Sequence, residues 1–312
     1  MRPVFKPAIT QYNNDDYEVL RTYLFRTLGP YCSYCEAPIS NDSAVEHKVP
    51  KNTKKGFPAQ ATEWRNLLIA CQSCNSAKGT RPYALKTYTA TSAAWVWPDK
   101  TAPMPNQPSL PEDESYLSFG FSDNSYSQVE LADLELVRLE DGKTKPWANA
   151  KHSMLWVVPS SSISDAVRTR VLATIQGLNL NFYNSDNQSY NDRRVINRLA
   201  AFNSAHSALT NLENVFEHHG RDINAAGVTY IIQAIRHTVV ASGFFSVWFR
   251  VFRKSLSNPA AGSYWYNIPV ADRLFLFEAL LLYYFPEESP TGARRLIFPG
   301  TDVDRLDMNS FV

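Results

Sequence analysis

The sequence predicts an α+β protein with a short hairpin and helix near its N-terminus, a small strand region, and a mainly helical C-terminal domain. The chain's four cysteines form two Cys-x2-Cys pairs separated by 35 residues, a spacing typical of a small clamped hairpin. Apolar and polar residues alternate over 115–139, as in strands with one buried face. Beyond about residue 162, apolar residues recur at helical spacing. With 312 residues, the chain can form one large domain or two.

The first expected elements surround the cysteines. Amide and acidic side chains begin a helix over 13–28, an apolar stripe runs along it, and Gly29 with Pro30 ends it. A short strand is expected over 45–49, and a helix over 71–78. The two cysteine pairs would then lie at the two ends of a hairpin that leads into a helix.

A proline-rich stretch over 98–114 predicts a linker, which divides the chain into 1–97, 98–114 and 115–312. Beyond the linker, 115–139 and 154–158 are expected to form a small set of strands. Helices are expected over 195–216, over 223–250 with a break or bend near Gly243, and from 267 to 285. The wide apolar faces of these helices predict a packed helical domain that serves partner binding, substrate choice or regulation.

The cysteine pattern predicts one tetrahedral zinc site. Two Cys-x2-Cys knuckles can hold a single zinc ion through four thiolates, and this arrangement leaves no cysteine for a disulfide. The predicted ligands are Cys32, Cys35, Cys71 and Cys74. From the spacing alone, a structural zinc ribbon without any chemistry is an equally good interpretation.

Composition argues against a membrane protein and against a polycation. The longest uncharged apolar stretches of the C-terminal half, 238–249 and 280–285, are well short of the ~20 residues that a membrane helix needs. Residues 1–9 lack the apolar core of a signal peptide, and the net charge of the chain is only +1. Low cysteine density is typical of reducing compartments, so we expect a cytoplasmic protein without membrane contact.

Polar residues inside the zinc loop suggest chemistry beyond a scaffold. Phosphodiester hydrolysis needs a base for water, charge neutralisation on the phosphate, and help for the leaving oxygen. His47 can accept a proton near neutral pH. Glu46 and Asn75 offer hard oxygen ligands suited to Mg²⁺ or Mn²⁺. A lone Glu-His pair is usually surface decoration, but the ordered combination with Asn66 and the cysteines is specific.

This combination resembles the HNH endonuclease family, in the form whose ββα-metal hairpin is clamped by a four-cysteine zinc. The likeness covers roughly residues 30–80, and 63–79 matches the family's characteristic second half. Two positions depart from the commonest pattern: Glu46 stands where Asp or His is more frequent, and Asn75 where His also occurs. Neither departure removes a required function.

The resemblance implies a role for each polar residue. Glu46 and Asn75 would hold a catalytic Mg²⁺ or Mn²⁺, and His47 would activate water. Asn66 would orient the hairpin loop that carries the base. The downstream half is similar, more faintly, to the HNH partners of ATPase-linked bacterial anti-phage systems such as Septu. That likeness implies a defence effector subunit with an ATPase or sensor protein as its partner.

Positive charge is concentrated around the motif. Between residues 48 and 86 the chain has eight basic residues and one acid, although its overall net charge is only +1. Such a patch binds phosphate without regard to base sequence, and its binding depends on salt. The expected partner is nucleic acid, with DNA favoured over RNA. The residues expected to bind nucleic acid are Lys48, Lys51, Lys78 and Arg81. An ordinary solvated face is the alternative for individual lysines.

Two further alternatives stay open at this point. The protein could be a non-catalytic zinc module that binds nucleic acid, although simple binding needs neither a base nor hard metal ligands. Residues 192–194, Asp-Arg-Arg, begin a helix and could contact nucleic acid or a partner. A solvated helix start is the favoured interpretation of that tripeptide.

Overall fold

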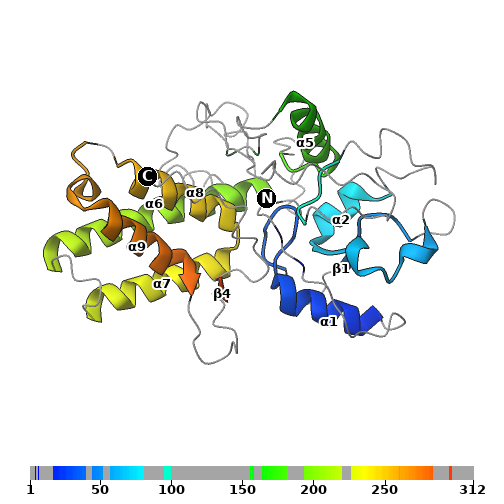
Figure 1. Cartoon of the computed structure of the whole chain (residues 1–312), viewed down its shortest axis with the longest axis horizontal. Helices are drawn as coiled ribbons and strands as arrows, with labels where there is room; N and C mark the ends of the chain where they lie inside the picture. The colour runs from blue at the N-terminus through cyan, green and yellow to red at the C-terminus, as the bar shows by residue number, and fades with distance from the viewer. Residues whose placement is uncertain are drawn as a thin grey trace, which may run out of the picture.

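The computed structural model describes residues 4, 6, 17–39, 44–51, 57–80, 95–99, 155, 157, 164–181, 193–219, 226–259, 261–283 and 295–296. Within these ranges the predicted α+β class is confirmed: a small two-stranded sheet near the N-terminus is followed by a mainly helical C-terminal region (Figure 1). The predicted strands over 115–139, most of the predicted linker and Arg81 lie outside the described residues.

The N-terminal part is a hairpin between two helices. It comprises α1 (Tyr17–Leu28), β1 (Ala44–His47), β2 (Leu67–Ala70) and α2 (Gln72–Lys78). Strands β1 and β2 pair antiparallel, with Ala44 opposite Ala70 and His47 opposite Leu67. All four residues of β2 are buried, and Leu20, Leu24 and Leu28 of α1 are buried in the same hydrophobic cluster.

Strand β1 ends at His47, two residues before the predicted end at Val49. The side chain of Asn66 explains the difference: its Oδ1 accepts from Val49 N–H, and its Nδ2 donates to Val49 C=O. A side-chain amide therefore replaces the next pair of the ladder. The chain then passes through two short 3₁₀ helices, η1 (Pro58–Gln60) and η2 (Trp64–Asn66), before β2. Helix α2 ends at Gly79, as predicted, where φ is +53°.

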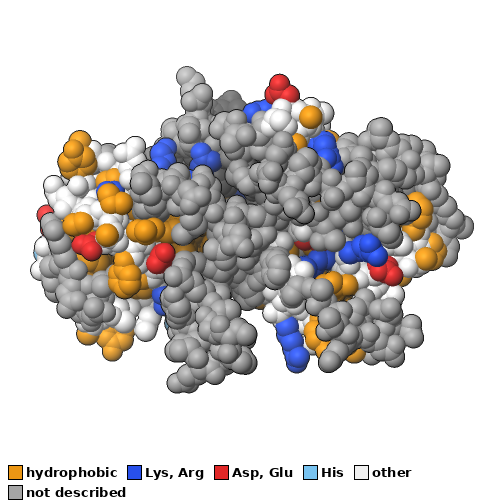
Figure 2. All heavy atoms as spheres, in the orientation of Figure 1, with side chains coloured by type: hydrophobic (Ala, Val, Ile, Leu, Met, Phe, Trp, Pro, Cys, Tyr) orange, Lys and Arg blue, Asp and Glu red, His pale blue; other side chains and the backbone are white. Residues whose placement is uncertain are grey.

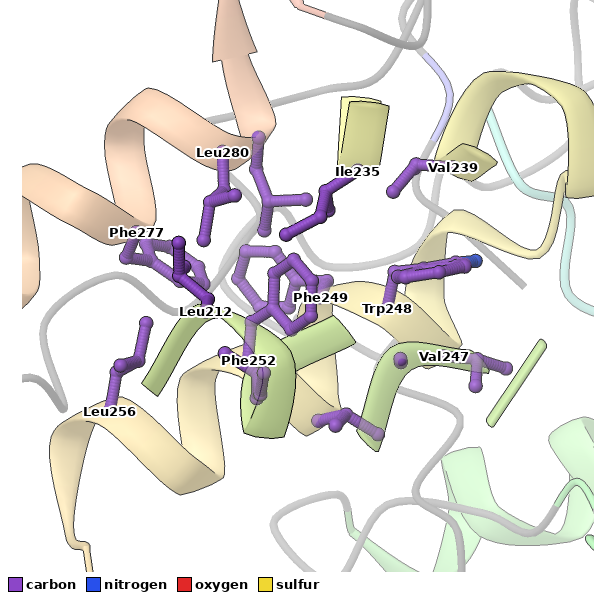
Figure 3. Packing of buried hydrophobic residues seen from close by; sticks show 14 of the residues in the cluster. Leu212, Ile235, Val239, Val247, Trp248, Phe249, Phe252, Leu256, Phe277 and Leu280 are labelled. Atoms are coloured by element: carbon purple, nitrogen blue, oxygen red, sulfur yellow. The ribbon is translucent and has the colours of Figure 1, made fainter. Parts of the chain in front are cut away.

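The C-terminal region contains five α-helices among the described residues. They are α5 (Asp165–Gly177), α6 (Arg194–His219), α7 (Ala226–Ser242), α8 (Phe245–Ser257) and α9 (Val270–Leu281), with η5 (Tyr264–Asn267) before α9. Helix α6 packs against α7 and α8, and α9 packs against both α7 and α8. Figure 3 shows the shared core, in which the Trp248 ring meets Phe252 edge-on, and Phe249 meets Phe277.

Two helices end more than three residues away from their predicted C-terminal ends. The break near Gly243 is confirmed, since Gly243 and Phe244 both have positive φ, but α8 continues beyond residue 250 because Val251, Phe252 and Leu256 extend its buried face. Helix α9 ends at Leu281 instead of 285. Residues Leu282–Tyr283 form β3, which pairs antiparallel with β4, Arg295–Leu296.

The hydrophobic residues form two cores, and these do not follow the predicted division at 98–114. Helices α6 to α9 form one core together with Tyr31, which lies between the first helix and the zinc knuckle. The hairpin, α1, residues 95–97 and helix α5 form the other. Helix α5 therefore packs with the N-terminal part although it follows the predicted linker. No helix in the described ranges is both long and apolar enough to cross a bilayer.

Candidate metal centre and active site

The four cysteines converge as the spacing predicts. Their sulfur atoms all lie within 4.8 Å of one another, and Cys35 Sγ and Cys71 Sγ are 3.7 Å apart. Four sulfurs around one zinc would lie about 3.8 Å apart, given a zinc–sulfur distance of about 2.3 Å. In the first knuckle, Cys35 N–H donates to Cys32 Sγ. The cluster thus fits a tetrahedral zinc ion.

The electrostatics of the cluster also favour a cation. Burial raises the pKa of the Cys74 thiol, and hydrogen bonding with Cys32 raises that of Cys35. Hydrogen bonds from the neighbouring cysteines, Cys32 foremost, lower the pKa of Cys71 far below its ordinary range. Without a cation, only part of such a cluster can ionise, because adjoining thiolates repel one another. Zinc would remove that restriction.

His47 is the last residue of β1, and its imidazole is held in one orientation. Nε2 lies 2.9 Å from the carbonyl oxygen of Ala61. A carbonyl can only accept, so Nε2 carries the proton, and the basic lone pair of the neutral ring lies on Nδ1. Burial lowers the pKa of His47 to about 4, so the ring is neutral at physiological pH. The residue is 8% exposed.

Asn66 ties together the loop on which His47 depends. Its side chain is fully buried and makes three hydrogen bonds to the backbone. Oδ1 accepts from Val49 N–H at 2.7 Å, and Nδ2 donates to the carbonyls of Val49 and Gln60 at 3.0 and 2.8 Å. Gln60 precedes Ala61, the acceptor for His47. The Asn66 side chain thus fixes the loop beside the imidazole.

Glu46 faces α2, which packs against β1. Its carboxylate is 2% exposed, and Oε1 lies 2.7 Å from Lys78 Nζ in an ion pair that lacks hydrogen-bond geometry. Lys78 Nζ also donates to the carbonyl of His47 at 2.6 Å. Asn75 is three residues before Lys78, and residues at this spacing share one face of a helix. Asn75 itself is partly exposed.

These two residues fit a divalent cation by their chemistry. Burial raises the pKa of Glu46, and Lys78 only partly opposes that shift. A carboxylate in such a position gains from a further positive charge close by. Carboxylate and amide oxygens are the ligands that Mg²⁺ and Mn²⁺ prefer.

The four expected phosphate-binding residues are placed very differently. Lys51 is exposed, and Arg81 lies outside the described residues. Lys48 is fully buried, with Nζ 2.9 and 3.0 Å from the two carboxylate oxygens of Asp99. Lys78 is 1% exposed beside Glu46. Neither buried ammonium group faces solvent, so Lys48 and Lys78 do not belong to an open phosphate-binding surface in this structure.

Figure 2 agrees with this arrangement: Lys and Arg side chains of the described residues are spread over the face shown and form no single patch. The partner of Lys48 was not foreseen from the sequence. Asp99 also pairs with Lys6 at 3.0 Å, and Lys6 Nζ donates to the carbonyls of Trp64 and Leu67. Burial acts to raise the pKa of Asp99, but Lys48 and Lys6 outweigh it and hold it below its ordinary value.

The favoured interpretation of residues 192–194 as a solvated helix start does not hold for Arg194. Its guanidinium is buried and donates to Cys74 Sγ from the start of α6. Glu36, beside Cys35, is buried as well, and its carboxylate accepts from Ser246 at the start of α8. Two helices of the C-terminal region thus reach the cysteine cluster. The sequence offers one weak signal, the pair Arg194 and Arg198, one turn apart and beside the apolar residues Val195 and Leu199.

An antiparallel hairpin leads into a helix, is clamped by four cysteines and carries Glu-His at the end of its first strand; this is the architecture of a ββα-metal hairpin. Comparison with known proteins agrees: residues 32–81 match the model of the HNH endonuclease family, which confirms the resemblance expected from the motif.

The chain is also 44% identical over 52 residues to the Septu protein PtuB of Bacillus thuringiensis. This match confirms a Septu likeness in the HNH region, whereas the expected likeness of the downstream half stays a prediction. The match covers 16% of this chain and 19% of that protein, so the chain spans about a fifth of that relative's length. No solved structure matches the chain.

Proposed function

We propose that this protein is a metal-dependent HNH endonuclease that hydrolyses phosphodiester bonds in nucleic acid, with DNA favoured over RNA. The observation that carries the proposal is the fixed imidazole of His47. Its Nε2–H is bound to Ala61 C=O, and its neutral form has the lone pair on Nδ1. A positioned, neutral imidazole is what activation of water requires.

Each residue then has one task. His47 accepts the proton of the attacking water at Nδ1. Asn66 keeps the loop with Ala61 in place, so that the imidazole cannot turn. Glu46 and Asn75 hold Mg²⁺ or Mn²⁺, which supplies charge neutralisation at the phosphate and help for the leaving oxygen. The cysteine cluster, with zinc bound, joins the two ends of the module.

A nuclease assay tests the proposal directly. Purified protein is incubated with supercoiled plasmid, single-stranded DNA and tRNA, each with Mg²⁺, with Mn²⁺ and with EDTA. Metal-dependent cleavage that EDTA stops is the expected result. Binding of nucleic acid without cleavage under every condition would contradict the proposal and indicate a non-catalytic zinc module.

The two expected metal ligands should differ from Asn66 in their response to metal. Glu46→Gln and Asn75→Ala each leave one ligand, so we expect cleavage to need a higher concentration of Mg²⁺ or Mn²⁺ and to recover partly at saturation. Asn66→Ala should lower the rate at every metal concentration, because it releases the loop at Val49 and Gln60. Metal titrations of the cleavage rate distinguish the two patterns. Unchanged titration curves for both ligand variants would place the metal elsewhere.

Substitutions of the buried Lys48 and the exposed Lys51 can be compared to distinguish a structural role from contact with phosphate. Lys48→Met leaves Asp99 without one of its two buried cations, and breaking a buried pair costs about 3–5 kcal/mol of stability. Lys51→Met removes an exposed charge, so stability should hardly change. If Lys51 contacts a phosphate, the slope of the logarithm of the binding constant against the logarithm of salt concentration should become shallower by about one in Lys51→Met. Denaturant unfolding measures the stability of each variant, and binding assays at several salt concentrations measure the phosphate contact. A Lys48→Met protein as stable as the wild type would contradict the buried ion pair of Lys48 with Asp99.

We further propose that the protein acts as a defence effector subunit with an ATPase or sensor protein as its partner. The likeness to the Septu protein PtuB supports this role. The helical region leaves Tyr230, Tyr266 and Phe275 exposed, and large exposed apolar side chains are frequent at protein interfaces. Plaque assays with and without the candidate ATPase test the role; protection that is unaffected by loss of the ATPase would contradict it.

A further inference from the structure

The start of helix α6 meets the cysteine cluster through one buried side chain. Arg194 is 5% exposed, and its Nη1 donates to Cys74 Sγ at 3.1 Å. The same nitrogen donates to the carbonyl of Leu178 at 2.9 Å, and Nη2 donates to that of Asn179 at 3.1 Å. Since Nη1 has two protons, one can serve the sulfur and the other the carbonyl. The sulfur contact is therefore a separate interaction of this guanidinium.

The positive charge of Arg194 can offset the negative charge of the zinc–thiolate cluster. Four thiolates around Zn²⁺ carry a net charge of about −2, which is costly to bury unless cations or donors lie close by. Arg194 supplies a positive charge and a donor at one sulfur. Arg198, one turn further along α6 and also buried, donates to the carbonyls of Leu155 and Leu180 and adds a second positive charge on the same side. Helix α6 thus presents two buried cations toward the cluster.

The first knuckle is anchored on the same helical region. The Glu36 carboxylate accepts from Ser246 N–H at 2.7 Å and from Ser246 Oγ at 2.6 Å, at the start of α8. The Glu36 carbonyl accepts from Phe244 N–H, and a Cβ on Gly243 would lie only 2.5 Å from that oxygen. Close backbone packing of this kind requires glycine at 243. Both knuckles are therefore held by helices of the C-terminal region.

We infer that Arg194 is part of the zinc centre: it is a positioning residue, supplied by the helical region, that holds the Cys74 thiolate and slows the release of zinc. The inference rests on the zinc site of the proposed function and extends it to a residue 120 positions away from the cysteine it contacts. Polar groups behind a metal ligand orient that ligand and tune its affinity for the metal. Charge-assisted donation to a zinc-bound thiolate also lowers its nucleophilicity, because the sulfur becomes less basic.

The test compares three variants of the full, zinc-loaded chain. Arg194→Gln removes both the positive charge and the planar guanidinium with its several N–H donors. Arg194→Lys keeps the charge but also loses the guanidinium. Arg273→Lys is the matched control, because Arg273 is a buried arginine of the same region that donates to the carbonyls of Ile268 and Leu256. Zinc affinity and release are measured by competition with a chromogenic chelator, and Cys74 reactivity by alkylation and peptide mapping.

Arg194→Gln should weaken zinc binding by about 10- to 100-fold and speed the alkylation of Cys74, with a smaller effect for Arg194→Lys. Arg273→Lys should lower the stability of the fold while zinc affinity stays at the wild-type value. Arg194 variants with wild-type zinc affinity, or an equal loss of zinc in Arg273→Lys, would overturn the inference. A wild-type chain that binds no zinc would instead refute the zinc site on which the inference rests.

A measurement on the wild-type chain covers the case in which neither Arg194 variant folds. The protein is loaded with an NMR-active cadmium isotope in place of zinc. We expect scalar coupling between cadmium and a guanidinium proton of Arg194, transmitted through Cys74 Sγ. Slowly exchanging Arg194 protons without any coupling would overturn the inference.

Discussion

His47→Ala is expected to abolish cleavage while the fold and the affinity for nucleic acid stay close to those of the wild-type protein. The imidazole acts on water in the transition state, and loss of a general base costs about 10²–10⁴ in rate. The side chain hydrogen-bonds to Ala61 C=O and takes no part in the backbone pairing of β1 with β2, so the hairpin should keep its pairing without it. Single-turnover cleavage with Mg²⁺, beside binding assays with Ca²⁺, measures the two properties separately.

His237→Ala is the matched control for this experiment. His237 is an exposed histidine on α7, so the same substitution there should leave cleavage unchanged. His47→Gln adds a second comparison, because its amide can still donate to Ala61 C=O but has no basic nitrogen. We expect this variant to fold like the wild-type protein and to remain inactive. Cleavage by His47→Ala at a rate near that of the wild type would mean that another residue is the base.

The local features of the site could be predicted from the sequence. The cysteine pairs, the Glu-His step and the helix from Cys71 to Gly79 all lie within one short segment, and their spacing restricts how they can meet. Strand β1 and helix α2 therefore form within two residues of their predicted bounds. The zinc cluster follows for the same reason, since four thiols with this spacing can surround one ion.

The distant contacts could not be predicted, because they depend on tertiary packing. The sequence predicts that Lys48 and Lys78 bind phosphate, yet each is buried against a carboxylate, Asp99 and Glu46 respectively. No local pattern pairs Lys48 with Asp99, 51 residues away. The contact of Arg194 with the cysteine cluster has the same origin.

Packing also changes how the two halves of the chain can be tested. Tyr31 donates to the carbonyl of Val240, and Thr174 on α5 accepts from the backbone of Val96. A fragment that ends near residue 98 would lose α5 from its own core, and would expose Tyr31 as well. Loss of activity in such a fragment would report unfolding. Single substitutions in the full chain are the better test of whether the helical region controls the nuclease.

Cys71→Ser is expected to have the largest effect on the fold. Zinc binding to sites of this kind is worth about 10–16 kcal/mol, comparable with the 5–15 kcal/mol that stabilises a whole domain. Cys71 is the N-cap residue of α2, where serine is strongly preferred. Taken alone, the substitution should therefore favour the helix. Any loss of structure can then be assigned to the missing zinc ligand.

The expected result is a protein without bound zinc whose hairpin is unfolded and whose α6 is less protected from hydrogen exchange, because Arg194 joins α6 to the cluster. Elemental analysis and hydrogen exchange measure the two effects. Ser33→Ala is the matched control in the first knuckle: Ser33 is fully buried and its hydroxyl makes no hydrogen bond with any residue that the structure describes, so its loss should be neutral or slightly stabilising. Full zinc content and a protected hairpin in Cys71→Ser would show that three cysteines suffice and that the four-thiolate site is wrong.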